Sequence, residues 1–133
     1  MLRRISVIVA SAAILALSAM PALASSHSST HKLPFPSLHG VQAWGTYQQT
    51  RRGVKLYVCT KDTGGSFAVA AIALASNSNY KQTVNFGAAA LGSGVTQCRG
   101  PVTLHLTAHL RIYTFILNNS GRIVAKSAIK KVY

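Results

Sequence analysis

Gly53-Val-Lys-Leu-Tyr-Val-Cys59 is the stretch from which the fold is best predicted. Apolar and polar side chains largely alternate along it, as they do in a β-strand. The stretch ends at one of only two cysteines in the chain, and the other is Cys98. We predict that the two sulfurs form a disulfide across a pair of β layers, and that the rest of the chain is arranged around this bond.

The alternation along this strand creates a conflict. Val54, Leu56 and Val58 would face one way, whereas Tyr57 and Cys59 would face the other, because successive side chains of a strand point to opposite faces. If Cys59 points into the core, Tyr57 does so as well, and another element must cover the aliphatic face. A sheet buried on both sides, or a β-bulge near Cys59, would resolve the conflict.

The first 24 residues have the pattern of a secretory signal peptide. Arg3 and Arg4 precede an apolar run over residues 7–17, and Ala22-Leu23-Ala24 fits the small-x-small cleavage pattern. The apolar run is shorter than the roughly 20 residues of a membrane-spanning helix, so we expect no stable membrane span. We predict cleavage after Ala24 and a secreted, extracellular protein, whose oxidising environment favours a disulfide between two lone cysteines.

The length that remains, residues 25–133, suits one domain. Residues 25–38 are rich in Ser, His and Pro, which predicts a flexible N-terminal arm, and residues 39–133 would form a single β domain. His27 and His31 lie four residues apart within the arm. Metal ligation needs three or four ligands held in place, so we expect a solvated linker, no metal site and no cofactor.

Turn signals divide residues 39–133 into about six or seven predicted strands. Such short spacing predicts an all-β fold, a small antiparallel β-sandwich or barrel with one disulfide. The signals lie at residues 50–53, 61–65, 77–79, 92–94, 99–101 and 118–121.

Three segments require separate interpretation. Phe67–Ala75 is continuously apolar, so periodicity does not separate a buried strand from a buried helix; we favour a strand. Residues 102–117 alternate clearly at first and then become apolar on both faces, which fits one long strand that becomes fully covered or two strands joined by a bend. Residues 122–133 show no break, which predicts one final strand.

The charge balance restricts function. Fourteen Lys and Arg residues face one acid, Asp62; removal of Arg3 and Arg4 with the signal would leave twelve and a net charge of about +11. Glycoside hydrolysis typically needs two carboxylates, and calcium sites need several. A Ser-His-Asp triad could use only Asp62, and the Gly-x-Ser-x-Gly motif is absent. We therefore predict that the protein is not an enzyme.

His105 and His109 are the basis of the one enzyme alternative. On a single strand they would share a face about 13 Å apart, at roughly 3.3 Å per residue, too far for joint metal binding. Two histidines with a nearby cation can cleave RNA by acid–base catalysis, so a basic ribonuclease is an alternative. The simpler interpretation is a pair of solvent-facing histidines.

Basic residues form two candidate anion-binding clusters. A cationic strip could bind a polyanion, or it could protect an edge strand from aggregation. Trp44, Tyr57 and Tyr133 lie near these cations in sequence and could stack on sugars or bases. The clusters are Arg51, Arg52 and Lys55 at the first turn, and Arg122, Lys126, Lys130 and Lys131 in the final strand.

Together these features predict a small, secreted, basic β domain without catalytic activity. Its expected partner is an anionic extracellular or cell-envelope polymer or an acidic protein surface, because the net charge attracts anions. We expect a monomer. The main alternative is a protein-binding module, for example an inhibitor of a secreted enzyme; the second is the ribonuclease.

Overall fold

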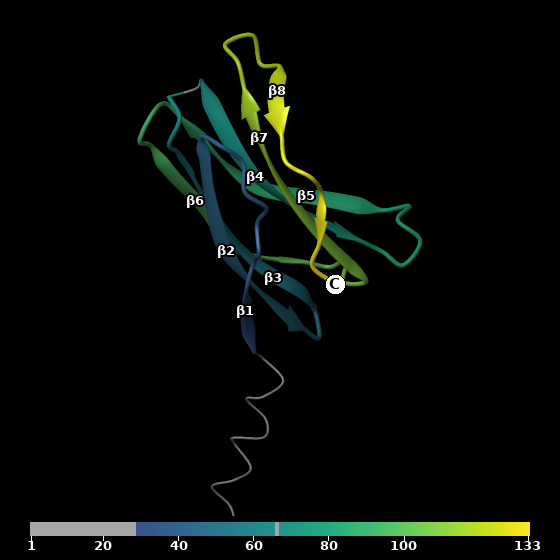
Figure 1. Ribbon diagram of the computed structural model, residues 1–133. Helices are drawn as coiled ribbons and strands as arrows, with labels where there is room; N and C mark the ends of the chain where they lie inside the picture. The colour runs from purple at the N-terminus through teal and green to yellow at the C-terminus, as the bar shows by residue number, and fades with distance from the viewer. Residues whose placement is uncertain (1–28, 66) are drawn as a thin grey trace, which may run out of the picture.

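The computed structural model describes residues 29–65 and 67–133 (Figure 1). These residues form two antiparallel sheets and no helix, and one disulfide joins Cys59 to Cys98. The predicted all-β fold with one disulfide is therefore confirmed. The predicted signal peptide, residues 1–24, lies outside the described residues.

Sheet A contains four strands in the order β1-β2-β3-β6, and sheet B contains five strands. In sheet B the order is β5-β4-β7-β8, and β9 also pairs with β7. The strands are β1 Thr30–Lys32, β2 Val41–Thr50, β3 Gly53–Asp62, β4 Ala68–Ser76, β5 Thr83–Leu91, β6 Thr96–Leu104, β7 His109–Leu117, β8 Ile123–Lys126 and β9 Lys130–Lys131.

The two sheets enclose one apolar core. Val54, Leu56 and Val58 of β3 are fully buried and form the sheet A side of it. Alternate residues of β4, β5 and β7 form the sheet B side, because successive side chains of a strand point to opposite faces. These are Ala71, Ala73 and Ala75, Phe86 and Ala88, and Leu110 and Ile112.

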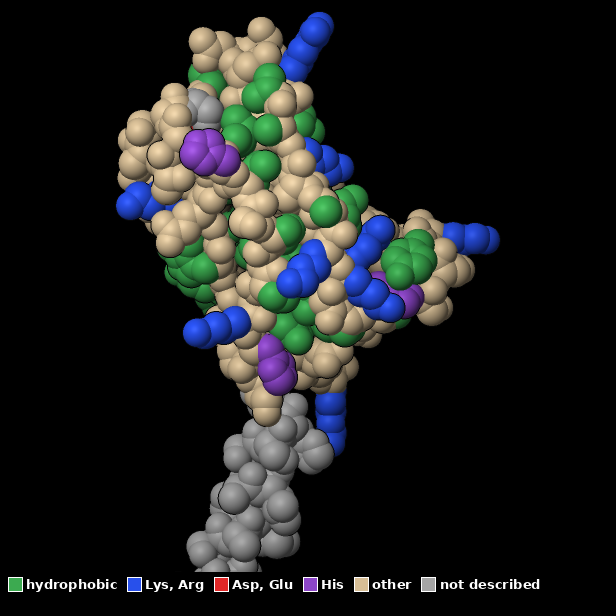
Figure 2. All heavy atoms as spheres, viewed as in Figure 1, with side chains coloured by type: hydrophobic (Ala, Val, Ile, Leu, Met, Phe, Trp, Pro, Cys, Tyr) green, Lys and Arg blue, Asp and Glu red, His purple; other side chains and the backbone are tan. Residues whose placement is uncertain are grey.

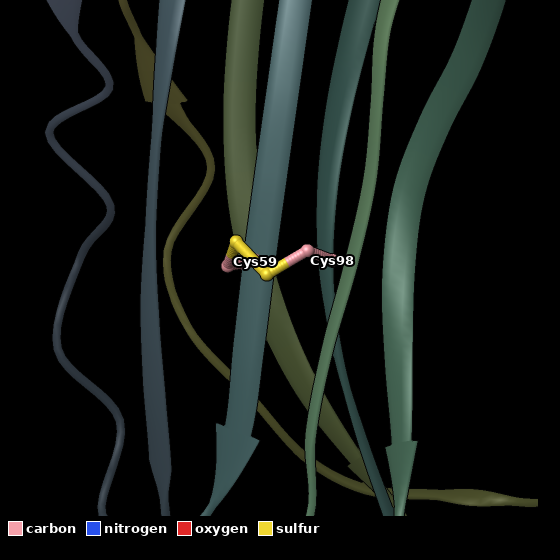
Figure 3. The surroundings of a disulfide bond; sticks show 2 residues. All are labelled: Cys59 and Cys98. Carbon is pink, nitrogen blue, oxygen red and sulfur yellow. A yellow bond between two sulfur atoms is a disulfide. The ribbon is translucent and has the colours of Figure 1, made fainter.

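The disulfide lies within sheet A and not between two layers, so this part of the prediction was wrong. Cys59 is directly opposite Cys98 on the neighbouring strand, with their Cα atoms 4.0 Å apart. Figure 3 shows the bond crossing from β3 to the adjacent strand. Directly opposed residues of antiparallel strands approach most closely at non-hydrogen-bonded positions. Cys59 and Tyr57 both belong to the outer face of sheet A, which resolves the conflict over their direction.

β6 continues through the predicted turn at residues 99–101. Its pairing with β3 shifts between Leu56 and Val58, where Gly100 and Pro101 occupy the position of one residue. Gly100 has φ +100°, and a Cβ there would lie 2.4 Å from the Leu56 carbonyl oxygen. The Gly-Pro pair therefore marks a bulge inside a strand, which is a common use of these residues in sheets.

Both ambiguous apolar segments are resolved. The preferred interpretation of Phe67–Ala75 as a strand is confirmed, because residues from Ala68 onward form β4 in the middle of sheet B. Residues 102–117 form two strands: β6 ends at Leu104 in sheet A, and β7 begins at His109 in sheet B. The link at residues 105–108 carries the chain from one layer to the other.

The ends of the domain differ from the prediction. Residues 122–133 form β8 and β9 and not one strand, because at Ser127 the side-chain oxygen replaces the backbone carbonyl in the pairing with β7. The Ser127 Oγ accepts the Thr114 N–H at 2.9 Å, while the Ser127 N–H still donates to the Thr114 carbonyl. Within the segment predicted to be an arm, β1 pairs with β2, and Leu33 is buried against Gly45. Residues 25–28 of that arm lie outside the described part of the chain.

Candidate anion-binding surfaces

Acidic side chains are absent from the described surface. Asp62, the only acid in the sequence, is fully buried at the end of β3, and its Oδ1 accepts the backbone N–H groups of Gly64 and Gly65 at 3.1 Å each. Ten of the twelve described Lys and Arg residues are exposed, and Lys61 and Arg111 are half-buried. Figure 2 shows basic side chains scattered over the face that it draws. The surface potential is therefore positive, with little local compensation.

The seven predicted anion-binding residues do not form one strip. Arg51 and Arg52 lie in the β2–β3 turn at one end of the molecule, and Arg122 lies in the β7–β8 turn at the other (Figure 1). Lys55 belongs to the outer face of sheet A. The break between β8 and β9 separates Lys126 from Lys130 and Lys131. The two clusters seen in sequence are thus distributed over different surfaces.

A groove on the outer face of sheet A brings together aromatic and basic residues that are distant in sequence. We call it the aromatic groove and define it by Lys32, Trp44, Thr46, Lys55 and Tyr57. It consists of two depressions of about 250 and 310 Å³ that share Thr46 and Tyr57. Lys55 borders the first depression, and Lys32 and the exposed ring of Trp44 border the second.

Strand register explains how the groove forms. Thr46 of β2 lies between Lys32 of β1 and Tyr57 of β3, and Trp44 is two residues along on the same face. Lys55 is two residues from Tyr57, so it also shares that face. The sequence indicated Trp44, Tyr57 and Lys55 but not Lys32, which belonged to the predicted arm. Only the pairing of β1 with β2 brings Lys32 to the groove.

The outer face of sheet B is mostly apolar. Tyr113, Phe115 and Leu117 of β7 lie opposite Ile72, Ala70 and Ala68 of β4, respectively. Small residues of β4 and β5 leave a depression of about 480 Å³ between the larger side chains; Ala70, Gly87 and Ala89 are among the residues that line it. One of the two interpretations of residues 102–117 was a long strand whose second half is covered on both faces. In the structure the outer face of β7 is only partly buried by neighbouring side chains.

Cations surround this apolar face. Lys126 Nζ lies 4.6 Å from the centre of the Tyr113 ring, and Lys131 is directly opposite Arg111. On the β5 side, the Arg99 guanidinium lies 5.3 Å from the centre of the Phe86 ring and donates to the Gly87 carbonyl at 3.4 Å. In such positions the charged ends of Lys and Arg side chains stay near water, while their aliphatic parts cover apolar surface.

The two histidines of the ribonuclease hypothesis contact different parts of the chain. His105 Nδ1 lies 3.0 Å from the Arg52 carbonyl oxygen. His109 Nε2 lies 3.2 Å from the Ser78 carbonyl oxygen, and its ring stacks on Tyr80 with 4.2 Å between the centroids. Each ring thus uses one nitrogen to bind a separate backbone carbonyl, and no observation here favours a shared acid–base site.

Tyr133, the third aromatic residue proposed to stack on a ligand, packs within the protein. Its ring lies 5.7 Å from that of Tyr47, which in turn stacks on His31 at 5.2 Å. Burial raises the pKa of the Tyr133 hydroxyl above its usual value. Tyr133 is therefore a neutral part of the core edge and a poor candidate for ligand stacking.

Within the described ranges no group of three or more His, Cys, Asp or Glu side chains is positioned to bind a metal ion. The same residues contain no helix with the length and hydropathy that a membrane crossing requires. Comparison with protein-family models, with curated proteins and with solved structures gave no match to this chain.

Proposed function

We propose that the protein is a secreted, non-enzymatic β domain that binds anionic polysaccharides of the cell envelope or extracellular space through the aromatic groove. The observation that supports this most directly is that the outer face of sheet A brings Trp44 and Tyr57 together with Lys32 and Lys55 along two adjoining depressions. Aromatic rings offer flat apolar surfaces on which the sugar rings of a polysaccharide can stack. The ammonium groups of the two nearby lysines would then bind carboxylate, phosphate or sulfate groups of the same polymer.

The rest of the surface favours the same class of ligand. Asp62 is buried, so no acidic side chain on the described surface repels a polyanion. Cations outside the groove raise the local concentration of anionic chains and speed their encounter. In the groove, Thr30 and Thr46 add hydroxyl groups that can donate to sugar oxygens. Charge thus attracts the polymer, and the groove supplies the contacts that select a sugar chain.

The test is binding to immobilised heparin, a sulfated polysaccharide, with neutral dextran as the comparison. We expect retention on heparin that falls steeply with salt, because bound cations release counterions from the polymer. Trp44→Ala and the double variant Lys32→Gln/Lys55→Gln should each weaken binding by about tenfold, or roughly 1.4 kcal/mol.

Lys81→Gln/Lys130→Gln is the matched control, since both lysines are exposed and neither lines the groove. It removes the same charge and should change binding by no more than about twofold, equivalent to roughly 0.4 kcal/mol. Equal losses in the two double variants would show that net charge alone causes retention, and the groove proposal would then be abandoned. Salt-insensitive capture of a secreted protein would instead favour the protein-binding alternative.

A further inference from the structure

The second feature of interest is an exposed apolar end of sheet B, on the side of the sandwich opposite the aromatic groove. We define the apolar end by Phe67, Leu91, Leu117, Ile123 and Val124. Four of these side chains are exposed: Phe67 by 47%, Leu91 by 63%, Ile123 by 52% and Val124 by 59%. Soluble sheets usually present polar residues on their open face, and large exposed apolar patches typically mark interaction sites.

Strand register brings these five residues together. Ala68 of β4 is opposite Leu91 on one side and Leu117 on the other, and Leu117 is opposite Ile123. Phe67 precedes Ala68 and lines, with Leu117 and Val124, a depression of about 390 Å³ beside the β7–β8 turn. Figure 2 shows hydrophobic side chains over β8 and a basic side chain beyond the tip of that turn. The patch therefore lies on strand ends and a projecting turn.

Cations lie next to the apolar end. Arg122 directly precedes Ile123, and Lys126 is two residues after Val124 on β8. Arg99 lies at the β5 edge, and Arg111 and Lys131 lie farther along the outer face of sheet B. The surface thus combines protruding apolar side chains with two adjacent cations, Arg122 and Lys126, and with further cations along sheet B. Its chemical complement is a surface that accepts apolar side chains and carries negative charge.

We propose that the apolar end docks the protein on an anionic lipid bilayer. Protruding apolar side chains can enter the boundary between head groups and acyl chains, while nearby Lys and Arg side chains contact the phosphates. A second copy of the chain is a poorer complement, because the same cations would face one another across the interface. Since the aromatic groove lies on the opposite outer face, a docked protein would present that groove away from the membrane.

The test is co-sedimentation of the full processed chain with lipid vesicles. One set contains phosphatidylcholine with about one third phosphatidylglycerol, and the other contains phosphatidylcholine alone. We expect binding to the anionic vesicles and little to the neutral ones. The double variant Ile123→Ser/Val124→Ser should reduce the partition coefficient by about tenfold or more, because it removes two exposed apolar side chains from the docking surface.

Val124→Ser and Val84→Ser form a matched pair. Both valines are exposed, but Val84 is 42% exposed at the far end of β5, next to the position where Ser76 pairs with Thr83. Val124→Ser should weaken vesicle binding, whereas Val84→Ser should not; likewise Lys126→Gln should weaken it more than Lys81→Gln. Circular dichroism and thermal unfolding establish that each variant is folded.

Three outcomes would overturn the proposal: no binding to anionic vesicles, equal effects of Val124→Ser and Val84→Ser, or capture of an acidic protein in place of lipid. Heparin binding distinguishes failure here from failure of the proposed function. Ile123→Ser/Val124→Ser should retain heparin binding, since neither residue lines the aromatic groove. Trp44→Ala should conversely retain vesicle binding.

Discussion

Asp62 shows how one buried residue can stabilise the domain. It is fully buried at the end of β3, and its Oδ1 accepts two backbone N–H groups, from Gly64 and Gly65. Asp62→Ala leaves those donors without this acceptor, and we expect the free energy of unfolding to fall by ~1.5–3 kcal/mol. Asp62→Asn keeps a side-chain oxygen and should lose less. Urea unfolding measures both; an alanine variant as stable as the asparagine variant would contradict this role.

The cysteines show what a residue pattern can and cannot predict. Two cysteines in a chain with a predicted export signal were enough to predict the bond, which closes a loop spanning a sequence separation of 39. Whether it joins two layers or two neighbours in one layer depends on strand register. That register contains a bulge between Leu56 and Val58, and alternation along β3 alone does not reveal which strand lies beside it. The pairing was therefore predictable and its position was not.

Strand β6 illustrates the same limit for an element. Arg99-Gly100-Pro101 has the composition of a turn, yet β6 continues through it because the edge of sheet A accommodates a bulge. Similarly, alternation predicted strand structure in residues 102–117, but the division of these residues between two sheets depends on the core that both sheets share. Local composition identifies where a strand is irregular; long-range pairing decides whether the chain turns there.

Gly100 provides a test of this interpretation of β6. A Cβ at Gly100 would lie 2.4 Å from the Leu56 carbonyl oxygen, and the residue has φ +100°. Gly100→Ala should therefore destabilise the protein by more than ~2 kcal/mol, because backbone strain and a steric clash add together. Gly94→Ala is the control: Gly94 also has positive φ, +78°, but no atom lies within 4 Å of its added Cβ. Its expected cost is only ~1–2 kcal/mol.

Urea unfolding of both glycine variants, with hydrogen exchange at the amides of β6, measures the difference. We expect Gly100→Ala to reduce protection on both sides of the bulge and Gly94→Ala to leave it close to that of the wild type. If the two substitutions destabilise the protein equally, close packing between β3 and β6 is not the reason that position 100 needs a glycine.

At the scale of the whole molecule, composition predicted a positively charged surface but not where aromatic and apolar side chains gather on it. Twelve cations and one acid made a positive domain predictable from counting. The aromatic groove depends on Lys32, which reaches it only because β1 pairs with β2. The apolar end depends on the meeting of β4, β5, β7 and β8. Both surfaces are products of topology, and neither is continuous in the sequence.

The excess of positive charge also predicts how salt affects the folded state. Two unit charges about 10 Å apart in water repel by ~0.4 kcal/mol, and folding brings many like charges together. Raising ionic strength from about 0.01 to 0.15 M shortens the Debye length from roughly 30 to 8 Å. We therefore expect NaCl in this range to raise the free energy of unfolding by on the order of 1 kcal/mol, whereas heparin retention falls over the same range.

Arg51 and Arg52 offer a direct control for this prediction. They are adjacent and exposed in the β2–β3 turn, and neither borders the aromatic groove or belongs to the apolar end. Arg51→Gln/Arg52→Gln removes two neighbouring like charges, so the variant should be more stable than the wild type at low salt and should gain less from added NaCl. Urea unfolding of both proteins at the two salt concentrations measures the effect. If stability is constant or falls with salt in the wild type, self-repulsion does not limit the stability of this domain.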